Sequence, residues 1–67
     1  MVLDSTERAR LKETRISVGL KQSELAEKVG VSTALISQIE TGKSIPTFEV
    51  LTKIQEVLDF ASKESHP

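Results

Sequence analysis

The sequence has no cysteine, which excludes disulfide bonds and thiolate metal sites as a means of stabilising the fold. Its 67 residues leave room for one domain, and a domain of this size buries only about 60% of the surface that the unfolded chain exposes. Stability must therefore come from packing, with self-association as a further contribution. The lack of cysteine also fits a cytosolic setting.

Long apolar runs are also missing. Met1, Val2 and Leu3 are followed at once by Asp4, which is not the pattern of a signal peptide. No apolar stretch approaches the roughly 20 residues that a membrane-spanning helix needs. We therefore expect a cytoplasmic protein with no membrane partner.

Residue patterns that support catalysis are scarce. The single histidine, His66, lies at the end of the sequence, and no phosphate-binding loop or metal-ligand spacing occurs. Glu24 and Glu27 are explained more simply as a solvated helix face than as catalytic carboxylates. We expect neither enzymatic activity nor a cofactor or metal site.

The charge balance is close to neutral, which by itself does not indicate a nucleic-acid partner. Nine lysines and arginines against ten aspartates and glutamates give a formal net charge of -1, whereas many nucleic-acid-binding proteins are clearly basic. Cations gather near the start of the chain and carboxylates toward its end, so one face of the fold can still be basic. The cations are Arg8, Arg10, Lys12 and Arg15, and the carboxylates are Glu49, Glu56, Asp59 and Glu64.

What the sequence does contain is four stretches with helical periodicity, separated by capping residues. Asp4, with Glu7 three residues later, has the spacing of a capping box. The helix that it begins is expected to end at about Ser17, before Gly19. A second helix is expected over residues 22–29.

The third helix is expected to begin after Ser32, a good N-cap, and to end at about Glu40. Thr47 is expected to cap a fourth helix, in which apolar residues recur with the 3.6-residue period. These residues are Phe48, Leu51, Ile54 and Leu58, with Val50 and Val57 widening the face. Because the pattern decays after Leu58, we expect one domain over residues 1–60 and a short frayed tail over residues 61–67. With no period-two alternation between turn residues, the fold class is predicted to be all-α.

The most informative segment is the corner between the second and third helices. Only three residues, from Gly30 to Ser32, separate them, which is too few for a relaxed antiparallel hairpin but enough for a sharp turn. Gly30 permits a positive φ at the bend, and Ala26 is small enough for the next helix to cross close above it. The expected wedge between the helices consists of Leu25, Val29, Val31, Ile36 and Ile39. The segment from Gln22 to Thr41 is therefore a candidate helix-turn-helix.

Four motifs follow one another over roughly residues 10–58. They are Gln22-x-x-Leu25-Ala26, Gly30-Val31-Ser32, Ile36-Ser37-x-Ile39-Glu40-x-Gly42-Lys43 and Pro46-Thr47-x-x-x-Leu51. In this order and spacing they resemble the lambda repressor and Cro family, often called the Xre family. The resemblance implies a compact, lambda repressor-like bundle of four to five short helices that binds duplex DNA. It also implies a prokaryotic or phage origin.

The third helix has an outer face that suits the major groove of DNA. At 100° per residue, Ile36 and Ile39 turn inward, and small uncharged side chains lie on the opposite side. Glutamine can pair with adenine, serine and threonine can bond several bases, and alanine can touch the methyl group of thymine. The expected base-contacting residues are Thr33, Ala34, Ser37 and Gln38. The alternative for this surface is an ordinary solvated helix face.

The resemblance also implies contacts with the DNA backbone on both sides of the recognition helix. Gln22 lies at the N-terminus of the second helix, where free amides favour a phosphate. Lys21 adds a cation there, although it caps the helix more weakly than the threonine or asparagine common in the family. Lys43 is the main candidate in the loop after the third helix. The expected backbone-contacting set is Lys21, Gln22, Ser32, Thr41, Lys43 and Ser44.

Three residues are expected to have structural roles. The resemblance implies that Arg15 of the first helix pairs with Glu40 near the end of the third and holds that helix in place. Such a pair is costly to break from one side. Leu35 lies at the edge of the buried stripe, and packing is expected there ahead of contact with a thymine methyl group or a partner subunit.

A short recognition helix reads few base pairs, so the default expectation is a homodimer on a palindromic operator, with half-sites about 34 Å apart. Relatives commonly continue after Leu58 with a glycine and another apolar helix, whereas Asp59 follows here. Pairing of two copies only on DNA is therefore also open. A small interface in the region of Phe48, Val57, Leu58 and Phe60 is a candidate.

The predicted function is sequence-specific binding of double-stranded DNA by a small transcriptional regulator, a repressor or an autoregulator. The alternative from another class is a protein-binding module. In that case the fourth helix and the acidic C-terminal half would dock an enzyme, a toxin or another regulator. An antitoxin would combine both activities.

Overall fold

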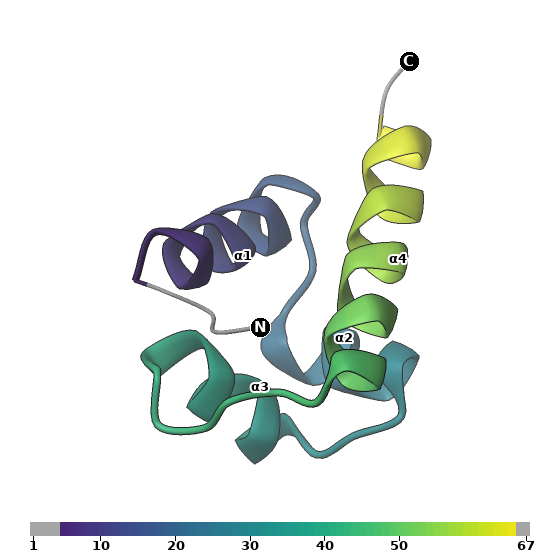
Figure 1. Ribbon diagram of the computed structural model, residues 1–67. Coiled ribbons are helices and arrows are strands. Elements are labelled where there is room, and N and C mark those ends of the chain that lie inside the picture. The colour runs from purple at the N-terminus through teal and green to yellow at the C-terminus, as the bar shows by residue number, and fades with distance from the viewer. Residues whose placement is uncertain (1–4, 66–67) are drawn as a thin grey trace.

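The computed structural model describes residues 5–65, which form four helices and no strand (Figure 1). The helices are α1 (Ser5–Ser17), α2 (Gln22–Val29), α3 (Thr33–Thr41) and α4 (Phe48–Ser65). The predicted all-α class is confirmed. Asp4, the expected cap of α1, and His66 lie outside the described residues.

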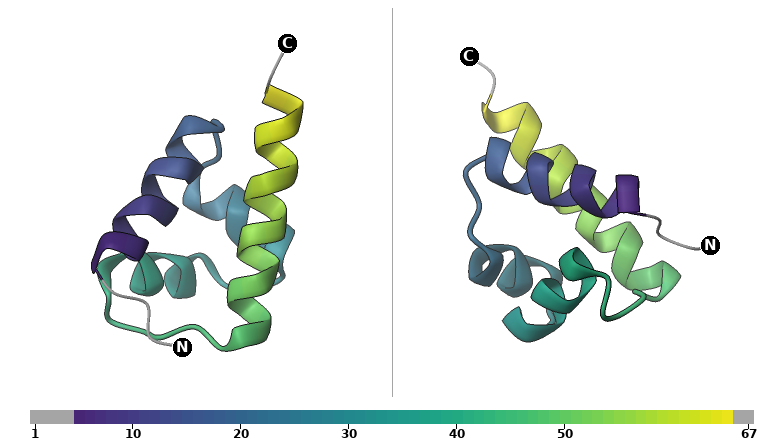
Figure 2. Two further views of the ribbon diagram at one scale, coloured as in Figure 1. Left: turned by 45° about the horizontal axis from the view of Figure 1, so that its top comes forward. Right: turned by 90° about the vertical axis from the view of Figure 1, so that its left-hand side faces the viewer.

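The helices are arranged so that α2 and α3 form one layer, and α1 and α4 lie on the same side of it (Figure 2). Helix α2 packs against both α3 and α4, and α1 packs against α3. The start of α1 lies beside the end of α3 in all three ribbon views. Within the described residues, none of the helices has the length and apolarity needed to cross a membrane.

The corner between α2 and α3 forms as the sequence predicts. Gly30 adopts a left-handed φ of 89°, which lets its amide and that of Val31 donate to the carbonyl of Ala26 and close the end of α2. Ser32 then begins α3, because its hydroxyl oxygen accepts a hydrogen bond of 3.1 Å from the amide of Leu35. The two caps fix the angle between the helices.

Eight buried apolar residues from α2, α3 and α4 form the core. Ala26, the small residue expected where the next helix packs on α2, is 2% exposed. The other seven are Leu25, Val29, Ile36, Ile39, Leu51, Ile54 and Leu58. Leu35 and Val31 are half-buried and pack against this core. Packing is therefore the role of Leu35, as expected.

Helix α4 differs from its prediction at both ends. It continues to Ser65, seven residues past Leu58, where the apolar pattern decays, so residues 61–65 of the expected tail are helical. No glycine or proline interrupts residues 48–65, and Ala61 and Ser62 are half-buried. At the other end, Phe48 is 74% exposed, because it is the first residue of the helix and projects past the edge of the core.

Candidate nucleic-acid interface

Helix α3 presents a small polar face on the side opposite its buried residues. Ile36 and Ile39 are each 1% exposed and point into the core. Thr33, Ala34 and Gln38 are exposed, whereas Ser37, the fourth of the expected base-contacting residues, is half-buried and lies closer to the edge of the face. The fold therefore brings these side chains together on one surface of one helix.

The hydroxyl groups at the two ends of α3 already have partners. Ser32 accepts from the amide of Leu35, and its own proton stays available for a phosphate oxygen. The Thr41 hydroxyl donates to the carbonyls of Ser37 and Gln38 at 3.0 and 3.3 Å. The Thr41 hydroxyl proton is therefore already used within α3. Because a phosphate oxygen needs a donor, Thr41 is a weaker candidate for a phosphate contact.

The loop after α3 folds back onto the end of the helix. Gly42 has a φ of 82°, and its amide donates to the carbonyl of Ile39 at 3.2 Å. The amides of Lys43 and Ser44 donate to the carbonyl of Gln38 at 2.8 and 3.1 Å. Because these three amides are directed inward, an anion beside the loop must be met by side chains, of which exposed Lys43 carries the charge.

Arg15 and Glu40 form the ion pair that the family resemblance implies. The guanidinium donates from Nε to Glu40 Oε2 at 2.7 Å and from Nη2 to Oε1 at 3.2 Å. Its Nη1 donates to the carbonyl of Leu20 at 2.8 Å. The two side chains are 9% and 5% exposed, so they are buried and unavailable as base readers.

Gln22 joins the same network, which sequence reasoning missed. Its Nε2 donates to Glu40 Oε1 at 3.1 Å, and the residue is half-buried. Gln22 is the first residue of α2. Through its bond to Glu40, its side-chain amide also helps to position α3. Sequence spacing carries no signal for this bond, because Gln22 and Glu40 are 18 residues apart.

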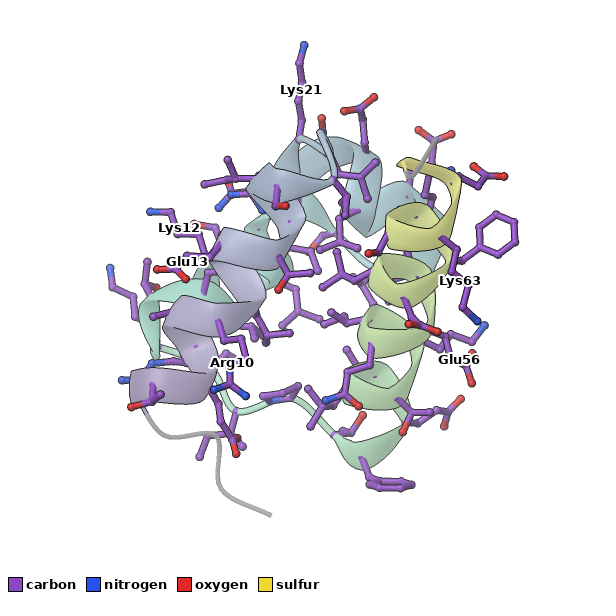
Figure 3. The ribbon with its side chains drawn as sticks, turned by 90° about the horizontal axis from the view of Figure 1, so that it is seen from above. Arg10, Lys12, Glu13, Lys21, Glu56 and Lys63 are labelled. Carbon is purple, nitrogen blue, oxygen red and sulfur yellow. The ribbon has the colours of Figure 1, made fainter. Side chains whose placement is uncertain are left out.

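Lys21 precedes α2 and has no side-chain cap to offer, since an ammonium group cannot accept a hydrogen bond. Glu24 supplies the other half of a capping box, because its Oε1 accepts from the amide of Lys21 at 2.8 Å. The Lys21 side chain extends away from the bundle (Figure 3). The ammonium group is thereby left exposed at the N-terminal end of α2.

A second arginine of α1 also reaches the end of α3. A Cβ atom placed on Gly42 would lie 2.8 Å from Cζ and Nε of Arg8, and 3.2 Å from its Nη2. The guanidinium therefore rests against the backbone where any other residue would carry its side chain. The sequence gives no sign of this contact between residue 8 and residue 42.

No cluster of three or more potential metal-ligating residues occurs among residues 5–65. The candidate site is thus a surface of polar and cationic side chains around α3. Such a surface is suited to binding an extended polyanion by hydrogen bonds and charge.

Comparison with known proteins agrees with this geometry. The helix-turn-helix family model matches residues 11–64. An uncharacterized helix-turn-helix transcriptional regulator of Archaeoglobus fulgidus is 40% identical over 52 residues, which cover 78% of this chain and 74% of that protein. The cryptic phage CTXphi transcriptional repressor RstR of Vibrio cholerae is 31% identical over 55 residues, or 82% of this chain.

The chain spans only part of most of these relatives. It covers 49% of the phage repressor and 17% of a regulatory protein of Methanococcoides burtonii that is 34% identical over 55 residues. The part that the family model matches, residues 11–64, contains α2, the corner and α3. The chain belongs to the lambda repressor-like helix-turn-helix family of transcriptional regulators, whose function is to bind DNA.

Proposed function

We propose that this protein binds double-stranded DNA in a sequence-specific manner by inserting α3 into the major groove. The observation that carries the proposal is the two-sided character of α3. Its inner side is fixed by Ile36 and Ile39, each 1% exposed, while its outer side consists of small, uncharged, hydrogen-bonding groups. Side chains of this kind allow a helix to approach base edges closely.

Base contacts are assigned to Thr33, Ala34, Ser37 and Gln38. Gln38 is the strongest of the four, because its exposed amide has both the donor and the acceptor that adenine N7 and N6 require. Backbone contacts are assigned to Lys21, Gln22, Ser32, Thr41, Lys43 and Ser44. Lys21 precedes α2 and Lys43 follows α3, so the two lysines flank the helix-turn-helix in the sequence.

The proposed biological role is transcriptional repression or autoregulation by occupancy of an operator. A bound protein of this kind blocks polymerase when its site overlaps a promoter. The relation to the phage repressor RstR supports this direction of regulation.

The proposal includes pairing of two copies on a palindromic operator. A hollow between the α1–α2 connector and the end of α4 is lined by Val18, Leu20, Val57 and Phe60, and Phe60 is 65% exposed. Lys28, Glu56 and Glu64 also line the hollow. It therefore offers a second copy an apolar surface together with charged groups of both signs. Leu58 is excluded from any interface because it is 4% exposed within the single chain.

A protein partner such as a toxin is the competing occupant of the same hollow. The molecular mass of the purified chain in solution distinguishes a homodimer from a chain that binds a different protein. A stable monomer that forms a complex only with a second, different protein would favour the protein-binding alternative.

The decisive experiment for DNA binding is selection of bound sequences from a pool of random duplexes. We expect enrichment of a short motif with two-fold symmetry. A pool that remains random after repeated selection, with a protein that is folded by circular dichroism, would contradict the proposal.

A further inference from the structure

The end of α3 is held by two arginines from α1, of which only one has an assigned role. Arg15 binds Glu40, and Arg8 lies against Gly42, with Cζ and Nε 2.8 Å from a Cβ atom placed there. The two arginines are seven residues apart, which is two helical turns, so they lie on the same face of α1. That face is the one that α1 turns toward α3.

A cation is favoured at this position because of the charge at the end of α3. The last turn of a helix carries partial negative charge from its free carbonyls, and α3 has no basic residue in its own last turn. Arg8 is half-buried, and its guanidinium lies against the backbone of Gly42. The guanidinium is therefore positioned by the fold before any ligand binds.

Arg8 also lies beside the loop after α3, which is proposed to contact the DNA backbone. Gly42 lies between Thr41 and Lys43, and the amides of residues 42–44 are directed into the end of α3. Phosphate oxygens at this loop must therefore be bound by side chains. The Lys43 ammonium is one donor group, and the Arg8 guanidinium, with its fork of donors, is the second.

We propose that Arg8 of α1 is a phosphate-binding residue of the DNA interface. Its guanidinium can lie beside the loop because Gly42 has no side chain to occupy that space. This inference rests on the proposed function and extends it to a helix outside the helix-turn-helix. It makes the loop after α3 a two-cation phosphate site, formed by Arg8 and Lys43.

Arg10 provides a matched control on the same helix. It is exposed and lines a hollow between α1 and α4 together with Leu58 and Asp59, away from Gly42. Figure 3 shows Arg10 and Lys12 leaving α1 on different sides. Replacement of Arg10 removes the same charge from the protein without touching the proposed site.

The test measures the affinity for a duplex that carries the selected motif, as a function of salt concentration. Each neutralised phosphate adds about 0.9 to the slope of log affinity against log salt. We expect Arg8→Ala to make the slope shallower by about 0.9 for each bound subunit, and Arg10→Ala to leave it unchanged. Between about 50 and 200 mM salt, the ratio of wild-type to Arg8→Ala affinity should fall about 3.5-fold for each subunit. Arg8→Lys, which keeps the charge, should retain most of the slope.

Three results would overturn the inference. One is an unchanged slope in Arg8→Ala, with or without a lower affinity, which would leave Arg8 as a positioning residue for the loop. Another is an equal change in Arg8→Ala and Arg10→Ala, which would indicate a general effect of net charge. The third is a wild-type protein that binds no duplex, which would remove the proposed function itself. Thermal unfolding of each variant, followed by circular dichroism, shows whether an affinity loss comes from unfolding.

Discussion

Arg15 and Glu40 are 25 residues apart in the chain and are joined by two hydrogen bonds between buried charged groups, of 2.7 and 3.2 Å. The same guanidinium reaches the carbonyl of Leu20, and the same carboxylate accepts from Gln22. One ion pair thus connects α1, the connector after it, the start of α2 and the last turn of α3. Helix α3 is fixed at that turn by polar bonds and along its length by the core.

Loss of either partner of this pair should be strongly destabilising. Arg15→Ala leaves the Glu40 carboxylate buried without a counter-ion, for which we expect a loss of about 3 kcal/mol in the free energy of unfolding. Urea denaturation followed by circular dichroism measures this value. Exposed Arg10→Ala is the control and should stay within about 0.5 kcal/mol of wild type. Equal stability of the two variants would show that the pair does not hold the fold.

Gln38→Ala should relax specificity without affecting stability. The side chain is exposed, so its removal should leave the unfolding midpoint unchanged, while discrimination at one base pair of each half-site falls by about 1–3 kcal/mol. Selection from random duplexes with wild type and variant gives this comparison directly. Gln55→Ala, at an exposed position on α4, should select the wild-type motif. If Gln38→Ala also selects it unchanged, Gln38 does not read a base.

Lys43→Ala should weaken binding to all duplexes by the same factor, because a phosphate contact carries no sequence information. We expect the slope of log affinity against log salt to become shallower by about 0.9 for each subunit. Lys53→Ala removes the same charge from an exposed position on α4 and should keep the wild-type slope. A change of motif in Lys43→Ala would instead indicate a base contact.

Gly30→Ala and Gly42→Ala should cost similar free energies of unfolding, about 1–2 kcal/mol each, because both positions have a left-handed φ. A new Cβ meets nothing within 4 Å at Gly30. At Gly42 it meets only the end of the Arg8 side chain, which can move aside at little cost. Denaturant unfolding of both variants tests this. A much larger loss at Gly42 would mean that the position of Arg8 is itself required for stability.

Phe60→Ser should weaken self-association, because Phe60 lines the apolar hollow beside α4. Removal of one buried aromatic contact in each copy should raise the dimer dissociation constant by at least about tenfold. Sedimentation equilibrium measures this constant. Phe48→Ser is the matched control, since Phe48 is equally an exposed phenylalanine of α4 but lies outside the hollow. No effect in either variant would place the interface elsewhere, and an equal loss in both would extend the interface from the hollow to Phe48.

The parts of the fold that follow from neighbouring residues were predictable from the sequence. Ser32 accepts a hydrogen bond from the amide of Leu35, and Thr47 accepts one from that of Val50. Gly30 and Gly42 close α2 and α3 with positive φ values. Each of these features needs only three or four consecutive residues, so the sequence pattern determines it. The ion pair of Arg15 and Glu40 was predictable only through the resemblance to a family.

Features that depend on packing were predicted less well. Periodicity places Phe48 on the apolar face of α4, but the core ends before it. The helix continues after Leu58 because half-buried Ala61 and Ser62 extend its contact surface, and Asp59 and Lys63 add an exposed ion pair of 3.5 Å. The bond between Gln22 and Glu40 and the contact of Arg8 with Gly42 depend on how α1, α2 and α3 cross. The DNA-contacting residues stay predictions.

The separation of the two sides of α3 has a consequence for how such a protein can change over time. Ile36 and Ile39 belong to the core, whereas Thr33, Ala34 and Gln38 are exposed, and no hydrogen bond of their side chains links them to the rest of residues 5–65. If this outer side reads bases, as proposed, mutations on it redirect the protein to a new target sequence while the fold tolerates them. Under that proposal, evolution and engineering can both change the preferred DNA sequence one residue at a time on an unchanged scaffold.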